Sequence, residues 1–231
     1  MAAIQSEFRE KEARLQADWR VQEKQIDSLQ SGALSALSMR QNAVDKRRLE
    51  AVDQLWEAVD TLAPIRVTAS WMEYFGTDEM LKIVEGDEKL SEMISAADGA
   101  IEALKMSGEA ARKARPFVTP MAWAYFSVYR SVLSYAVVQA KLIGSGLKYK
   151  ILKPDSIISL VKQSLPEFAE RLDNFGITVA YGQIEELESR VLSELQLMIS
   201  DSAQDDENVE RAAKILKAVR RVDADINKPS L

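Results

Sequence analysis

Histidine and cysteine are both absent from this 231-residue chain. Without histidine the chain lacks the commonest general base and the commonest metal ligand. Without cysteine it has no thiolate nucleophile and no disulfide. Ser-His-Asp catalysis, Cys-His catalysis and zinc sites of the usual kinds are therefore impossible within the chain. We predict that the protein is not an enzyme and that it holds no cofactor and no metal.

Carboxylates are the remaining groups that could support metal-dependent chemistry. They cluster at Glu185, Glu186 and Glu188, and again at Asp201, Asp205, Asp206 and Glu207. Two carboxylates can hold magnesium, but acidic residues just before a helix also stabilise its positive end. We interpret the second cluster as a helix start. The glycine patterns that cradle nucleotide phosphates are missing from the sequence.

Proline and glycine are nearly absent from the first quarter of the chain. Residues 1–63 contain no proline and a single glycine, Gly32. The segment is rich in Gln, Glu, Lys, Arg, Ala and Leu, which all favour helix. A helix of this length would extend about 95 Å at 1.5 Å per residue. We expect it to kink or hinge at Ser31-Gly32.

Large apolar residues recur along this segment at steps of eleven. Ile4, Leu15, Ile26 and Leu37 follow this step, and so do Phe8 and Trp19. Eleven residues make three turns at 3.67 per turn, so these positions form a nearly straight seam. Polar residues interrupt the seam, and the alternative is a solvated helix with scattered apolar residues. We predict a partner-binding face formed by Ile4, Phe8, Leu15, Trp19, Ile26, Leu29 and Leu37.

The remainder of the chain predicts an all-α domain. A broad apolar helical face is formed by Val44, Leu49, Val52, Leu55, Trp56, Val59 and Leu62. Further helices are predicted at 65–75, from 77 to 86, at 88–114, 120–144, 155–174, 184–198 and 205–222. The helix at 155–174 contains Pro166 and should kink or restart there, because Ser164 and Glu167 have the spacing of a capping box. A short extended segment is possible at 177–181. The predicted fold is all-α, with a long N-terminal coiled-coil-like helix (1–43), docked on a bundle of about six helices (44–226) and followed by a frayed tail (227–231).

Positive charge is concentrated in one segment, although the formal net charge of the chain is −6. Residues 110–154 contain eight basic residues, no acidic residue and seven aromatic residues. Such a mixture suits single-stranded nucleic acid or an anionic lipid surface. The preferred interpretation is that most of these rings are core, because Trp123, Phe126 and Arg130 share one helical face with apolar residues. The candidate anion-binding residues are Arg112, Lys113, Arg115, Lys148, Lys150 and Lys153.

The segment from Asp45 to Trp56 reads Asp-Lys-Arg-Arg-Leu-Glu-Ala-Val-Asp-Gln-Leu-Trp and follows a Gln/Glu/Arg-rich helix. This arrangement resembles a diffuse group of uncharacterised bacterial proteins with an N-terminal coiled-coil helix and a helical C-terminal domain. The resemblance implies a bacterial accessory protein and supplies no catalytic residues.

Taken together, these features predict a helical interaction protein that self-associates or docks to a protein partner through its N-terminal helix. The alternative is nucleic-acid or anionic-lipid binding through residues 110–154. We expect a cytoplasmic location with no signal peptide and no transmembrane segment, since charged residues interrupt the most apolar run, 117–147.

Overall fold

The computed structural model describes residues 2–86, 98–145, 153–200, 214–215 and 217–218; for most residues between 2 and 33 the description covers the backbone alone. Within this part of the chain all regular structure is helical and no strand is present, as predicted. The chain divides into two compact units, residues 1–47 and residues 48–231. The predicted boundary between 43 and 44 lies four residues before this division.

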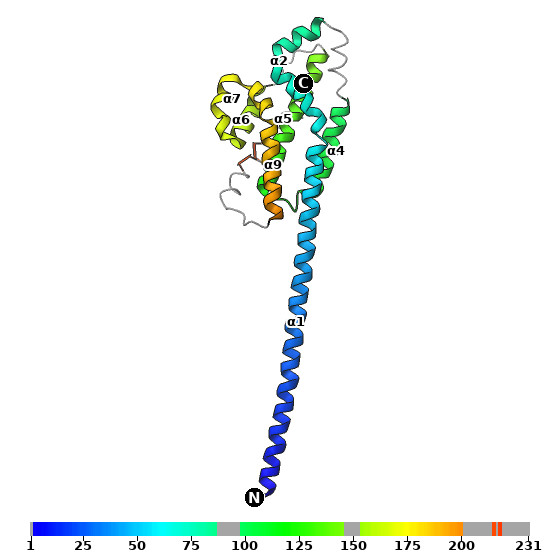
Figure 1. Cartoon of the computed structure of the whole chain (residues 1–231), viewed down its shortest axis with the longest axis vertical. Helices are drawn as coiled ribbons and strands as arrows, with labels where there is room; N and C mark the ends of the chain where they lie inside the picture. The colour runs from blue at the N-terminus through cyan, green and yellow to red at the C-terminus, as the bar shows by residue number, and fades with distance from the viewer. Residues whose placement is uncertain (1, 87–97, 146–152, 201–213, 216, 219–231) are drawn as a thin grey trace. The chain divides into compact units, whose positions relative to one another are not determined.

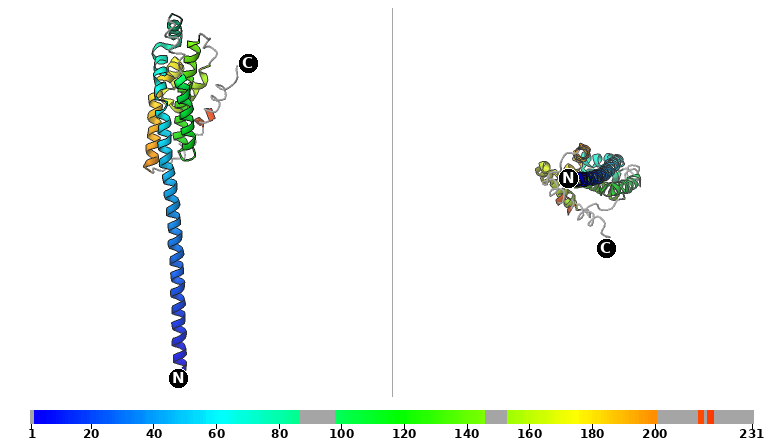
Figure 2. Two further views of the ribbon diagram at one scale, coloured as in Figure 1. Left: turned by 90° about the vertical axis from the view of Figure 1, so that its right-hand side faces the viewer. Right: turned by 90° about the horizontal axis from the view of Figure 1, so that it is seen from below.

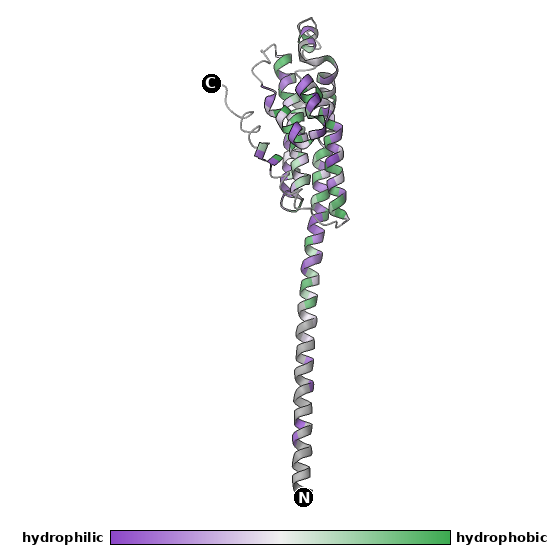
Figure 3. Cartoon of the chain, turned by 90° about the vertical axis from the view of Figure 1, so that its left-hand side faces the viewer, coloured by the Kyte–Doolittle hydropathy of each residue, from purple (hydrophilic) through white to green (hydrophobic). Residues whose placement is uncertain are grey.

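Helix α1 (Ala2–Asp60) is the one described element of the first unit, and its last turns belong to the second unit. It passes through Ser31 and Gly32 without interruption, so the predicted kink is wrong. Gly32 lowers the stability of the helix but adopts the helical conformation without steric hindrance. The Ser31 hydroxyl donates to the Ser28 carbonyl oxygen of the same helix at 3.2 Å. Figure 3 shows apolar and polar turns alternating along the described part of α1.

The C-terminal turns of α1 enter the core of the second unit. Ala51, Val52, Leu55, Ala58 and Val59 are buried, each at 8% exposure or less. The predicted apolar face is narrower than expected, because Val44, Leu49 and Trp56 are 39%, 52% and 36% exposed. The buried side of this part of α1 is therefore a narrow stripe rather than the broad apolar face that the sequence indicates.

Helix α2 (Ala63–Gly86) contains a sharp change of direction at Gly76, as predicted. Gly76 has φ 68° and ψ 163°, a backbone conformation that residues with a Cβ rarely adopt. Ile65, Ala69 and Met72 are buried before this glycine, and Met80 and Val84 after it. A break at glycine thus lets both halves of α2 turn an apolar side to the core.

Helix α5 (Pro120–Gly144) occupies the centre of the second unit (Figures 1 and 2). It contacts α2, α4 (Asp98–Ala114), α6 (Asp155–Ser164), α8 (Ile177–Gly182) and α9 (Ile184–Ile199). Its start is the predicted one: Pro120 is the first residue, and the Thr119 hydroxyl accepts a hydrogen bond from the Ala122 amide at 3.1 Å. Phe126, Tyr129, Val132 and Leu133 are each 1% exposed or less. Burial on nearly all sides explains why this is the most apolar helix.

The chain after α5 folds into α6 (Asp155–Ser164), a 3₁₀ turn (Pro166–Phe168), α7 (Ala169–Phe175), α8 (Ile177–Gly182) and α9 (Ile184–Ile199). The possible extended segment at 177–181 is wrong, because these residues are helical. Ile177, Thr178 and Val179 favour strands on their own. Packing of α8 against α2 and α6 overrides that preference and buries Val179, Ala180 and Tyr181.

Two details of the last elements complete the comparison with the sequence. Gly176 separates α7 from α8 with φ 64°, at the predicted helix end. The chain restarts at Pro166 as predicted, but no side chain caps that turn; the Ser164 hydroxyl instead donates to the Leu160 carbonyl oxygen at 2.9 Å. The predictions for 88–97, for the start and most of 205–222, and for the tail 227–231 lie outside the described residues. Each described helix is too short or too polar to cross a bilayer.

Candidate functional site

The predicted partner-binding face lies on α1 in the first unit. The side chains of Ile4, Phe8, Leu15, Trp19, Ile26 and Leu29 lie outside the described residues. Leu37, the seventh member, is described and is 63% exposed. It is part of a short apolar stripe with Leu34 and Val44, which are 67% and 39% exposed and lie three and seven residues away. The sequence prediction missed Leu34 and assigned Val44 to the packed face.

The predicted anion-binding residues fall into two groups. Arg112, Lys113 and Arg115 are exposed near the start of α5, and the Arg115 guanidinium lies over the Trp123 ring at 5.3 Å. Lys153 is exposed just before α6. Lys148 and Lys150 lie outside the described residues.

The structure does not bring Arg115 and Lys153 together. Asp155, two residues after Lys153, acts electrostatically on Tyr135 of α5. Tyr135 is twelve residues beyond Trp123, a distance of about 18 Å along a helix. The described members of the two basic groups therefore lie over different parts of α5.

The aromatic rings of the basic segment are mostly core, which confirms that interpretation. Tyr125, Phe126, Tyr129 and Tyr135 are each 4% exposed or less. A buried ring cannot stack on a base, so these four rings give no surface for single-stranded nucleic acid. Phe117, at 40%, is the one clearly exposed ring among the described members of this segment.

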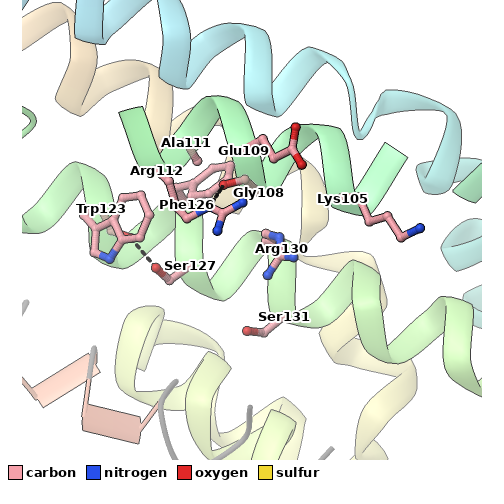
Figure 4. Close-up of a pocket in the computed structure, with 10 residues that line it drawn as sticks. All are labelled: Lys105, Gly108, Glu109, Ala111, Arg112, Trp123, Phe126, Ser127, Arg130 and Ser131. Atoms are coloured by element: carbon pink, nitrogen blue, oxygen red, sulfur yellow. Dashed lines mark hydrogen bonds between the residues drawn. The ribbon is translucent and has the colours of Figure 1, made fainter. Parts of the chain in front are cut away.

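A cavity of about 380 Å³ lies between α4 and α5 (Figure 4). Its charged lining consists of Lys105, Arg112 and Arg130 together with one carboxylate, Glu109. Hydroxyls come from Ser127 and Ser131, and the apolar wall comes from Ala111, Trp123 and Phe126. The volume is within the range of ligand pockets, which starts at about 300 Å³. The cavity combines a net positive lining with a ring wall.

The Arg130 side chain of α5 lies close to the backbone of α4 at Gly108. A Cβ at Gly108 would lie 3.3 Å from a terminal nitrogen of Arg130. That nitrogen donates to the Leu104 carbonyl oxygen at 3.3 Å. The Nε of Arg112 donates to the Gly108 carbonyl oxygen, also at 3.3 Å. Arg130 from α5 and Arg112 from α4 are thus both held at the backbone of the same stretch of α4.

Two further polar clusters connect the helices of the second unit. Arg66 of α2 pairs with Glu188 of α9 at 2.5 Å, and the Tyr129 hydroxyl donates to the same carboxylate at 3.4 Å. Burial, reinforced by Glu188, raises the pKa of Tyr129. The Tyr181 hydroxyl donates to buried Gln139, and burial raises the pKa of Tyr181 as well. These tyrosines stay protonated at neutral pH and join α2, α5, α8 and α9.

The carboxylates singled out in the sequence do not form a metal site among the described residues. Glu186 pairs with Arg190 at 2.7 Å, and Glu188 pairs with Arg66. No group of three or more potential metal ligands occurs in the described ranges. The second cluster, at 201–207, lies outside them.

One exposed surface was missed in the sequence. Val67, Trp71, Tyr74 and Phe75 of α2 are 55%, 36%, 83% and 43% exposed, and the last two rings pack edge to face at 4.9 Å. They lie at spacings of four, seven and eight residues, on one side of the helix. The available signal was that 65–75 contains Val67, Trp71, Tyr74 and Phe75 in addition to the apolar residues of its buried side.

Comparison with protein-family models, curated proteins and solved structures found no match.

Proposed function

We propose that the protein is a non-enzymatic interaction protein that self-associates through its N-terminal helix. The observation that supports this proposal is the composition of the first unit, in which α1 is the single described element. A helix with no second element in its own unit has no tertiary packing there to stabilise it. In proteins most helical stability comes from tertiary packing of an apolar face rather than from helix propensity.

The described apolar side chains of this unit fit the same proposal. Leu34, Leu37 and Met39 are exposed by 63–70%. A second copy of the helix would cover Leu34 and Leu37, which share one side, whereas single exposed apolar residues such as Met39 need no partner.

The eleven-residue step favours a second copy over an unrelated partner. A repeat of eleven residues predicts a right-handed supercoil, and a second copy of this helix carries the same repeat. Described residues on the side of the helix opposite the seam include Arg20 and Lys24, which are exposed. A charged outer side and an apolar seam are the two surfaces that a coiled coil requires.

Light scattering on the full-length chain tests the proposal. The subunit mass is 25.8 kDa, and we expect the wild-type mass to be a multiple of it. The double substitution Ile26→Glu and Leu37→Glu places two charges on the seam and should reduce the mass to that of one subunit. The matched control, Ser28→Glu and Ser38→Glu, adds the same charge at exposed positions beside the seam and should keep the wild-type mass.

A wild-type mass of one subunit at all concentrations up to about 100 µM would overturn self-association. Docking to a different protein would then remain as the role of the helix. An equal loss of mass in both double variants would instead show that association depends on charge alone.

A second candidate is binding of nucleic acid or an anionic lipid surface through the basic segment. It is supported by the exposure of Arg112, Lys113, Arg115 and Lys153 in a stretch without acidic residues, and the burial of most rings in that stretch counts against it. Charge reversal at Lys148, Lys150 and Lys153 should abolish binding of single-stranded DNA or anionic vesicles at low salt. Absence of binding by the wild-type protein would reject this candidate.

A further inference from the structure

The cavity between α4 and α5 has the lining of a site for a small oxyanion. Arg112 comes from α4 and Arg130 from α5, and both line the same space (Figure 4). Arginine presents a planar fork of donors that matches carboxylate and phosphate oxygens. We propose that this cavity binds a small organic phosphate or carboxylate, with its charged group at Arg112 and Arg130.

The position of Arg130 is fixed by its surroundings. It is half-buried, and its terminal nitrogen donates to the Leu104 carbonyl oxygen of α4, next to the backbone of Gly108. A guanidinium held in place loses little rotamer entropy when it binds an anion. Arg112 is exposed, and its Nε is bonded to Gly108 O, so its terminal nitrogens are oriented rather than freely rotating.

The other polar groups of the lining determine how well the two arginines can hold an anion. Lys105 also lines the cavity, although Figure 4 shows its side chain extending away from both arginines. Glu109 is the one lining carboxylate and competes with a bound anion, so the two arginines still exceed the negative charge of the lining. The Ser127 hydroxyl donates to the Trp123 carbonyl oxygen at 2.7 Å, so its proton is already used and Ser127 offers no donor to a bound anion. Ser131 lines the cavity beside Arg130 with a second hydroxyl.

The two aromatic rings of the cavity indicate what is attached to the charged group of the ligand. Trp123 and Phe126 line the cavity, and their ring centroids are 5.7 Å apart. Arg115 covers Trp123 at 5.3 Å and holds the indole against α5. A flat or apolar body attached to the charged group would contact this wall and displace water from it. We therefore expect a phosphate or carboxylate monoanion or dianion attached to a small apolar group, rather than a polymer.

Calorimetric titration of the full-length protein with phenyl phosphate, inorganic phosphate and uncharged phenol tests the proposal. Phenyl phosphate should bind saturably at one site per chain, inorganic phosphate more weakly, and phenol not at all. Equal binding of phenol and phenyl phosphate would overturn it, because the arginines would then contribute nothing. Absence of saturable binding by both phosphates would overturn it as well.

Neighbouring residues on α4 supply the matched variants. Arg112→Gln removes a cavity cation, whereas Lys113→Gln removes the same charge from an exposed residue that does not line the cavity. We expect Arg112→Gln to weaken phenyl phosphate binding about tenfold or more and Lys113→Gln to change it less than about twofold. Glu109→Gln should tighten binding about threefold. Equal effects of Arg112→Gln and Lys113→Gln would overturn the proposal, since they would indicate a diffuse basic surface of the kind that nucleic acid or lipid uses.

Discussion

Helix α1 belongs to both units of the chain, and the same helix has a different environment in each. In the second unit Leu55 is completely buried, whereas in the first unit Leu37 is 63% exposed. Both are leucines in a helix of similar composition, so helix propensity does not separate them. The difference lies in neighbours: residues 48–60 share a core with other helices, while the described part of the first unit is one helix. Helix formation and helix packing are thus separate problems in this protein.

The largest expected effect comes from the same substitution in the two regions. Leu55→Ala should lower the free energy of unfolding by about 3 kcal/mol, because it opens a cavity in the core. Leu37→Ala should change it by less than about 0.5 kcal/mol, as is usual for exposed positions. Urea unfolding at low protein concentration, followed by tryptophan fluorescence, measures both. If Leu37→Ala proved as destabilising as Leu55→Ala, the contrast between the two units would disappear.

A smaller effect is expected at the glycine of α1. A Cβ at Gly32 would meet no other atom within 4 Å, so Gly32→Ala adds helix propensity without a clash and should stabilise the helix locally by about 0.5–1 kcal/mol. Hydrogen exchange in peptides around residue 32 should slow by about two- to fivefold. Gly99→Ala, at an equally open position in α4, should leave those peptides unchanged. Faster exchange in Gly32→Ala would show that a hinge is required there.

The smallest expected change in the free energy of unfolding at pH 7 comes from substituting Tyr135 of the second unit. At alkaline pH the same substitution should have a clear effect. Burial, together with Asp155, raises the pKa of Tyr135 to about 12. An unfolded tyrosine ionises near pH 10. The stability that Tyr135 contributes is therefore complete below pH 10 and is lost as the pH rises from 10 to 12.

Tyr135→Phe should consequently lose less stability than the wild type between pH 10 and pH 12, with little change at pH 7. Tyr74→Phe removes a hydroxyl that is exposed, since Tyr74 is 83% exposed, and should follow the wild type at each pH. Urea unfolding at pH 7, 10 and 11.5 provides the measurement. Residues 1–47 contain no tyrosine, so tyrosine ionisation should destabilise the second unit and not the first. Identical pH profiles for Tyr135→Phe and the wild type would contradict the assigned pKa.

Local signals in the sequence predicted most helix boundaries. Thr119-Pro120 starts α5, and Gly76 and Gly176 mark a kink and a helix end as expected. These signals act through the backbone of a few adjacent residues, so no distant contact can easily change them. The helical state of 177–182 was not predictable in this way, because β-branched residues favour a strand until packing against α2 and α6 decides otherwise.

Some candidate sites can likewise be found in the sequence alone, whereas others depend on how the helices pack. The eleven-residue seam and the basic segment can be read from spacing and composition alone, and so can the absence of histidine and cysteine. The cavity between α4 and α5 cannot, because Gly108 and Arg130 are 22 residues apart and meet only when the two helices pack. By itself the sequence determined that the chain is helical and where most helices begin and end, since those choices depend on neighbouring residues. The tertiary structure decided which apolar residues are buried and which charged residues share a cavity, since those depend on the contacts between helices.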